Sequence, residues 1–234
     1  MREGISVDFE KGKLTSIIGV NGCGKSTLLK AILGILSLSN GEIFIDGENL
    51  LTISRNEIAK KIAYLSQGKN IPDMTVEQMV LHGRFPYLSY PRRYSSHDRE
   101  VAIKAMEAVG IAEFAHKPLY SLSGGMRQNA YIAMALAQDT DYILLDEPTT
   151  YLDIAHQLEL MRILRKLADS GKGIVTVMHD LPLAFDFPDK LTVMSNGKII
   201  AYGTPSEICE SHIVENVFGV KIKQVQKGKY LYEY

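Results

Sequence analysis

A glycine-rich segment, GVNGCGKST, begins at Gly19 and restricts the chain to few folds. It fits the pattern G-x-x-x-x-G-K-[ST], in which glycines let backbone N–H groups approach phosphate oxygens, the lysine adds charge and the hydroxyl can reach Mg²⁺. An apolar run at 14–18 precedes it, and apolar residues at helical spacing follow it. This order predicts phosphates bound at a helix N-terminus, in preference to a simple glycine-rich turn. The residues expected to hold the nucleotide here are Gly19, Asn21, Gly22, Cys23, Gly24, Lys25, Ser26 and Thr27.

Length and charge narrow the class of protein further. The 234 residues suffice for one large domain, which should bury roughly 70 to 75% of the surface of its unfolded chain. Lys and Arg number 26 against 27 Asp and Glu, without a long run of either sign, which argues against nucleic acid as a partner. No apolar stretch approaches the roughly 18 to 20 residues that cross a bilayer, and two cysteines are too few for a disulfide framework. We therefore expect a cytoplasmic chain in a reducing compartment.

The pattern of apolar runs predicts an α/β fold. Turn signals Asn40-Gly41 and Asp46-Gly47 bracket a short alternating segment, which indicates a hairpin in an antiparallel layer. The strand signal disappears from about 70 to 120, where we expect an inserted helical subdomain within a single domain 1–234. Helical stretches separate the remaining runs, which is typical of a mainly parallel sheet. The predicted strands after the first helix are 62–65, 142–145, 174–178 and 191–194, while the chain after 208 gives a weak, mixed signal.

Four further motifs follow the phosphate loop in a specific order. Gln67 follows the strand at 62–65, and then come LSGGMRQ, YILLDEPTTYLD and VTVMHD. Together they resemble the ATP-binding subunit of ABC transporters, matched across nearly the whole chain. The resemblance implies a P-loop NTPase core of the ABC ATPase fold, with ATP and Mg²⁺ as cofactors and ATP hydrolysis as the reaction.

Two adjacent carboxylates end one of the apolar runs. From an extended backbone, Asp146 and Glu147 cannot both point the same way, which separates their tasks. Asp146 suits the orientation of Mg²⁺, and Glu147 suits the polarisation of an attacking water, as phosphoryl transfer requires. The alternative is a pair of solvated acids at a strand end. With the resemblance, Ser26, Gln67 and Asp146 form the expected metal set.

The catalytic assignment also includes a histidine and a glutamine. His179 ends the predicted strand at 174–178, where its imidazole can bond a γ-phosphate and sense its presence. It resembles the switch histidine of the family, and Gln67 resembles the glutamine of the glutamine loop. The resemblance therefore places Glu147, His179 and Gln67 in the catalytic group. The other histidines lack metal-ligand spacing and are interpreted as surface or packing residues.

A second glycine-bearing helix start supplies a second anion site. Ser123, Gly124 and Gly125 precede a helical stretch and can bind phosphate oxygens. The resemblance implies that two copies pack head to tail, so that each signature closes over the ATP on the other copy. It also implies that Asp153 contacts nucleotide and links the two active sites.

Two positions depart from the family pattern. Met126 stands where the signature usually has glutamine, so a contact to the opposite ATP's sugar is expected to weaken. The family also begins with a strand and an aromatic residue that stacks on adenine. Residues 1–9 align with what normally follows that strand, so we expect either that a first segment of the native gene product is missing here or that another side chain stacks on the base. On either alternative we expect weaker ATP binding than in relatives with the aromatic residue.

The segments PDMTVEQMVLHGRFPYLS and TTYLDIAHQLELMRILRKLA resemble the ATPases of bacterial importers for iron siderophores, haem and vitamin B12. The resemblance implies a transmembrane permease contacted through about 68–94, an indirect link to a substrate-binding protein, and a peripheral position on the inner face of the membrane. The alternatives are a soluble non-transport ABC ATPase, or a nucleotide-binding module or small-molecule kinase. The last leaves the signature motif and Gln67 unexplained.

Overall fold

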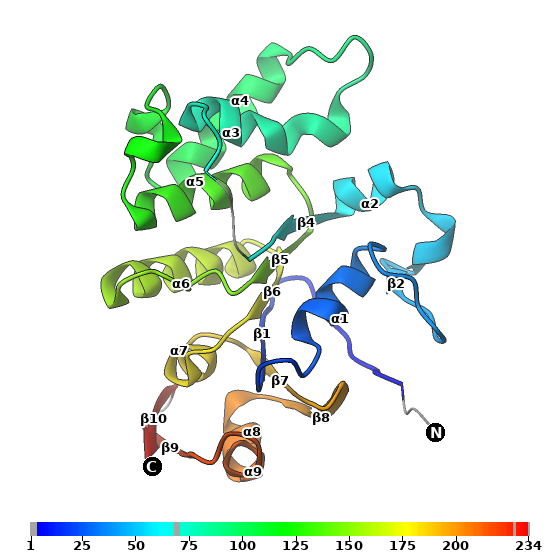
Figure 1. The fold of residues 1–234 in the computed structure, drawn as a ribbon, viewed down its shortest axis with the longest axis vertical. Coiled ribbons are helices and arrows are strands. Elements are labelled where there is room, and N and C mark those ends of the chain that lie inside the picture. Colours follow the sequence, from blue (N-terminus) through cyan, green and yellow to red (C-terminus); the bar gives the residue numbers. More distant parts are fainter. Residues whose placement is uncertain (1–3, 68–70, 227, 234) are drawn as a thin grey trace.

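A six-stranded sheet runs through the centre of the molecule in the order β4-β5-β6-β1-β7-β8 (Figure 1). This computed structural model describes residues 4–67, 71–226 and 228–233. All neighbouring strands are parallel except β7 and β8, which are antiparallel, so the predicted mainly parallel sheet is confirmed. The strands are β1 (Leu14–Gly19), β4 (Ile62–Leu65), β5 (Tyr142–Asp146), β6 (Gly173–Val177), β7 (Lys190–Ser195) and β8 (Lys198–Gly203).

Both faces of this sheet are covered, which explains the continuous apolar runs in the sequence. Alternate residues of β5 enter different hydrophobic clusters, with Ile143 and Leu145 in one and Leu144 in the other. Helix α1 (Lys25–Ile32) covers the Leu144 face. The opposite face packs against α6 (Ile154–Asp169) and α7 (Leu181–Asp186).

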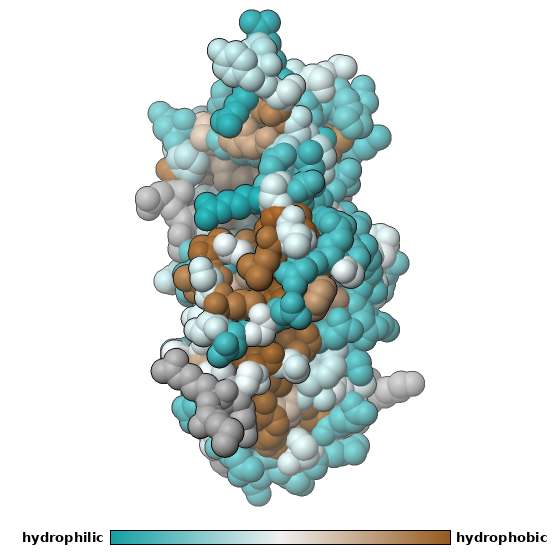
Figure 2. Space-filling model, turned by 90° about the vertical axis from the view of Figure 1, so that its right-hand side faces the viewer, coloured by the Kyte–Doolittle hydropathy of each residue, from teal (hydrophilic) through white to brown (hydrophobic). Residues whose placement is uncertain are grey.

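The predicted hairpin forms a small antiparallel layer. Its strands are β2 (Phe44–Ile45) and β3 (Glu48–Asn49), followed by the 3₁₀ helix η1 (Leu50–Thr52) and α2 (Arg55–Lys61). Figure 2 shows the side of the molecule that carries α1, α2 and β2, where apolar side chains gather on the surface. Exposed large apolar residues in this part of the chain are Ile35, Leu36, Phe44 and Leu51.

Helices occupy the chain between β4 and β5. Among the described residues of this stretch no strand is assigned, and only an isolated antiparallel bridge joins Thr75 to Pro118. The helical segments are α3 (Val76–Leu81), η2 (His82–Tyr87), α4 (Ser96–Ala108), η3 (Ala112–Phe114), η4 (Leu119–Ser121) and α5 (Gly124–Ala137). Helix α5 packs on α3, α4 and β4, so the helical part reaches beyond the expected end near 120. The division into a domain 1–234 with a subdomain at about 70–120 stays a prediction, and residues 68–70 lie outside the described ranges.

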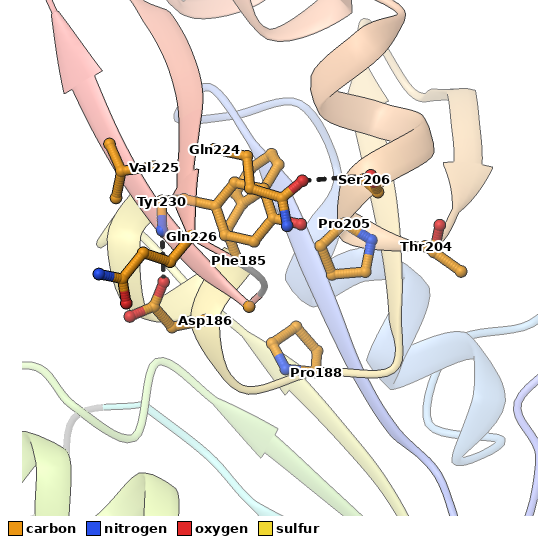
Figure 3. A pocket seen from close by; sticks show the side chains of 11 residues that line it. Phe185, Asp186, Pro188, Thr204, Pro205, Ser206, Gln224, Val225, Gln226 and Tyr230 are labelled. Atoms are coloured by element: carbon orange, nitrogen blue, oxygen red, sulfur yellow. Dashed lines mark hydrogen bonds between the residues drawn. The ribbon is translucent and has the colours of Figure 1, made fainter.

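The last part of the chain, where the sequence signal was mixed, folds into two short helices and a hairpin. These are α8 (Pro205–Glu210), α9 (Ile213–Phe218), β9 (Lys221–Gln226) and β10 (Lys229–Glu233). An open pocket of about 680 Å³ lies between the hairpin, α7 and α8 (Figure 3). Ser206 donates a hydrogen bond to Gln224 Oε1 there at 3.4 Å, and the Tyr230 N–H donates to Asp186 Oδ1 at 2.9 Å.

A buried ion pair ties η2 to α4 and α5. Arg84 Nε donates to Asp98 Oδ1 at 2.9 Å, and Arg84 Nη1 donates to the Ala137 carbonyl at 3.0 Å, at the end of α5. Both side chains of the pair are less than a tenth exposed. Burial alone would raise the pKa of Asp98, but hydrogen bonds from Ser95 and Arg84 lower this pKa to about 2.

Replacement of Asp98 by asparagine is expected to lower the free energy of unfolding by about 3 kcal/mol at pH 7, because it leaves a buried guanidinium without its carboxylate. The pKa of Asp98 is lower in the folded chain than in the unfolded chain. The ionised carboxylate therefore contributes fully to the free energy of unfolding above its ordinary pKa, and this contribution disappears as the pH falls toward 2. Urea unfolding should therefore give a difference between wild type and variant that is about 1 kcal/mol smaller at pH 3 than at pH 7. The exposed Asp73→Asn is the control, and a difference independent of pH would contradict this account.

Candidate functional site

The glycine-rich loop connects β1 to α1 at the carboxyl end of the sheet. Gly22 and Gly24 have φ values of +76° and +106°, a conformation that side chains with a Cβ rarely adopt. At Gly19 an added Cβ would lie 2.3 Å from the Met194 carbonyl oxygen. Gly24 is the N-cap of α1 and makes no side-chain cap bond, so the first N–H groups of the helix remain available to an anion.

Lys25 holds a positive charge inside this loop. Its side chain is almost completely buried, and Nζ donates to the carbonyl oxygens of Gly19 at 2.7 Å and Val20 at 3.2 Å. Those carbonyl partners keep the ammonium beside the N-terminus of α1, so charge and helix dipole act on the same space.

The other predicted loop residues differ in exposure. Asn21, Gly22 and Thr27 are exposed. Cys23 is 4% exposed and packs into the hydrophobic cluster beneath α1, so its side chain supports the loop from behind.

Asp146 ends β5 beside this loop and is held from two sides. Ser26 Oγ donates to Asp146 Oδ1 at 3.1 Å, and the Tyr64 hydroxyl donates to Oδ2 at 3.3 Å. Burial, together with the charge of Asp146, raises the pKa of Tyr64 to about 12, so the phenol is a neutral donor at ordinary pH. A carboxylate and a hydroxyl within hydrogen-bond distance are the hard oxygen ligands that suit Mg²⁺.

Glu147 turns away from Asp146. Its φ of +54° is unusual for a residue other than glycine, and this left-handed conformation reorients the backbone after β5. Its side chain is bonded by Gln67 Nε2, contacts His179 Nε2 at 2.5 Å and accepts from Thr150 Oγ1 at 3.4 Å. The two adjacent acids therefore have separate partners, one set at the loop and one set at Gln67 and His179.

The signature segment starts a different helix. Ser123 is the N-cap of α5, and its Oγ accepts a hydrogen bond from the Met126 N–H at 3.3 Å. Gly125 lies so close to His156 that an added Cβ would be 2.0 Å from the imidazole. Asp153 caps α6 and contacts His156 Nδ1 at 2.8 Å, so the start of α6 is packed against the signature.

The predicted site residues thus form two groups. Hydrogen bonds and neighbouring positions join Lys25, Ser26, Asp146, Glu147, Gln67 and His179 into one group. Ser123, Gly124 and Gly125 start α5, which lies among the helices of the upper part in Figure 1, apart from the loop between β1 and α1. Asp153 belongs to this second group through its contact with His156.

Tyr64 and Thr150 were not recognised as site residues from the sequence, and His156 was interpreted only as a surface or packing residue. Tyr64 had one available signal, a polar ring in the otherwise apolar run IAYL. Thr150 and His156 had none, because their contacts with Glu147 and Gly125 depend on the fold of the segment after β5. Part of the expected permease contact, residues 68–70, and part of the N-terminal departure, residues 1–3, lie outside the described ranges.

Comparison with known proteins agrees with this geometry. Residues 2–150 match the ABC transporter family. A petrobactin import ATP-binding protein of Bacillus anthracis is 42% identical over 216 residues, covering 92% of this chain and 79% of that protein. A ferric enterobactin transport ATP-binding protein of Escherichia coli K12 is 40% identical over 221 residues, covering 94% of this chain and 82% of that protein.

Solved structures show the same fold. MJ1267, an ATP-binding cassette of an ABC transporter in its ADP conformation, superposes with a TM-score of 0.83 at 26% identity. The superposition covers 93% of this chain and 90% of that one. Across the described ranges, every helix is too short or too polar to cross a membrane.

Proposed function

Because this chain belongs to the ATP-binding subunits of ABC transporters, we propose that it hydrolyses ATP to power a bacterial importer of iron(III) siderophores or a related metal chelate. One observation supports the proposal that the chain hydrolyses ATP. At one end of the sheet, Ser26 is hydrogen-bonded to Asp146, and the adjacent Glu147 contacts Gln67 and His179. The choice of an iron chelate, ahead of haem or cobalamin, rests on relatives whose names specify petrobactin and ferric enterobactin.

The first group of residues supplies the parts that phosphoryl transfer needs. Backbone N–H groups at the start of α1 and the Lys25 ammonium bind phosphate oxygens. Ser26, Asp146 and the amide oxygen of Gln67 are the groups that would hold Mg²⁺, which would supply charge neutralisation at the phosphates. Glu147 orients and polarises the attacking water, and its carboxylate is already positioned by Gln67 and His179.

The second group is assigned to the neighbouring copy in an ATP-dependent, head-to-tail dimer. A helix start that carries two glycines can bind anions, yet α5 lies apart from its own chain's phosphate loop. A second copy brings Ser123, Gly124 and Gly125 over the triphosphate, and Asp153 lies at the same interface. The closed pair then makes contacts that exist only when the γ-phosphate is present. Bound ATP therefore shifts the equilibrium from open toward closed pairs.

The described part of the expected contact region, residues 71–94, is assigned to the permease. It includes α3 and η2, and its exposed aromatic residues are Phe85, Tyr87 and Tyr90. Through this contact the chain is placed on the inner face of the membrane, and a substrate-binding protein acts on it only through the permease.

Purification from the cells of origin tests the assignment. A tagged copy should retain a polytopic membrane protein, and the reconstituted complex should hydrolyse ATP faster when a binding protein loaded with an iron(III) siderophore is added. Binding proteins loaded with haem or cobalamin are the comparison arms. Ribosomal proteins or DNA retained in place of a membrane protein would favour the soluble alternative and contradict the proposal.

A further inference from the structure

Tyr64 reaches Asp146 from a neighbouring strand. In the parallel pairing of β4 with β5, Tyr64 lies opposite Leu144, two residues before Asp146. Two residues of a strand advance about 6.6 Å, so the phenol must lean along the strand direction to bring its hydroxyl to the carboxylate. The observed contact, 3.3 Å between the hydroxyl and Asp146 Oδ2, shows that it does.

The surroundings fix this orientation. The Tyr64 ring packs against the hydrophobic cluster beneath α1, which includes Leu144 and Val177. Asp146 is only 5% exposed, and a carboxylate so far from water requires hydrogen-bond donors. Ser26 and Tyr64 are the donors that the described residues supply to its two oxygens.

These two donors differ in their relation to the metal. Ser26 belongs to the proposed magnesium ligands, whereas Tyr64 bonds the far oxygen of Asp146 and approaches from β4. We propose that Tyr64 is a positioning residue for magnesium binding, because its hydroxyl holds Oδ2 and keeps Oδ1 directed toward Ser26. This inference rests on the proposed ATPase function. A residue that orients a metal ligand typically changes metal affinity by about 10- to 100-fold when it is removed.

The test is Tyr64→Phe, which removes one hydroxyl and keeps the ring that packs in the core. A fluorescent ATP analogue in EDTA should bind with the same affinity as to wild type. Mn²⁺ should bind about tenfold more weakly in an electron paramagnetic resonance titration with a non-hydrolysable analogue present, and half-maximal ATPase activity should need about tenfold more Mg²⁺. The maximal rate at saturating Mg²⁺ should stay within about twofold, because Tyr64 touches neither nucleotide nor water in this account.

The matched control is Tyr142→Phe. The Tyr142 hydroxyl donates to Asp46 at 3.3 Å at the opposite end of β5, so its loss should leave the metal dependence unchanged. Unchanged Mn²⁺ and Mg²⁺ affinities in Tyr64→Phe would overturn the inference, as would an equal loss of analogue binding with and without metal. Absence of magnesium-dependent hydrolysis in the wild-type chain would instead count against the proposed function, so the two failures are distinguishable.

Discussion

Substitution of Glu147 by glutamine is expected to give a subunit that binds ATP and pairs with a second copy but hydrolyses ATP at least about 100-fold more slowly. Glutamine has nearly the same shape and can still bond to its neighbours, but its amide cannot accept the proton of the attacking water. The carboxylate that is lost is the one held between Gln67 and His179. Nucleotide binding should survive, because Lys25 and the start of α1 are untouched.

Single-turnover hydrolysis and size-exclusion chromatography with ATP measure the two consequences. Glu159→Gln is the matched control, because it makes the same chemical change at an exposed position on α6. It should leave both turnover and pairing unchanged. Normal turnover in Glu147→Gln would remove this residue from its assigned role, and loss of ATP binding would point to a structural role instead.

Mixing two inactive variants is expected to restore hydrolysis. Lys25→Ala removes the ammonium from the phosphate loop, and Ser123→Arg places a long side chain at the start of α5, so each variant alone should retain less than about 1% of activity. In a head-to-tail pair, the phosphate loop of the Ser123→Arg subunit faces the intact signature of the Lys25→Ala subunit. An equal mixture should therefore recover up to about a quarter of wild-type activity, since half of the pairs contain one complete site of two.

The controls concern folding and subunit exchange. Ser123 caps α5, so its replacement should cost about 1 kcal/mol of stability, and thermal unfolding must show that each variant is folded at the assay temperature. Each variant is also assayed at the total concentration of the mixture. Activity in the mixture no greater than the sum of the two variants, despite proven pairing, would mean that one subunit encloses the triphosphate alone.

Particular elements show how far the sequence predicted the fold. The runs that became β1, β4, β5, β6 and β7 were recognisable because strands buried on both faces are mostly apolar along their length. The hairpin of β2 and β3 followed from its turn residues. The end of the chain could not be predicted, since α8 and α9 have six residues each and β9 is exposed along most of its length. Their stability comes from packing on one another and from the packing of α8 on β7 and β8, which leaves little periodicity in the sequence.

At the candidate site, the local sequence indicated which residue types are present, and tertiary packing decided which of them contact one another. The glycines, Lys25 and the adjacent acids predicted a phosphate loop and its partner strand, because close backbone approach and a charged group each require particular residue types at fixed spacing. The divergence of Asp146 and Glu147 was predicted from an extended chain, but in the structure it arises because β5 ends at Asp146 and Glu147 has a left-handed backbone with φ of +54°. Three other contacts join residues that are far apart in the chain. They are the hydrogen bond from Tyr64 to Asp146, the contact of His156 with Gly125, and the hydrogen bond by which Arg84 links η2 to the end of α5. Such contacts depend on strand order and helix placement, which a local pattern does not encode, and so only the folded chain could reveal them.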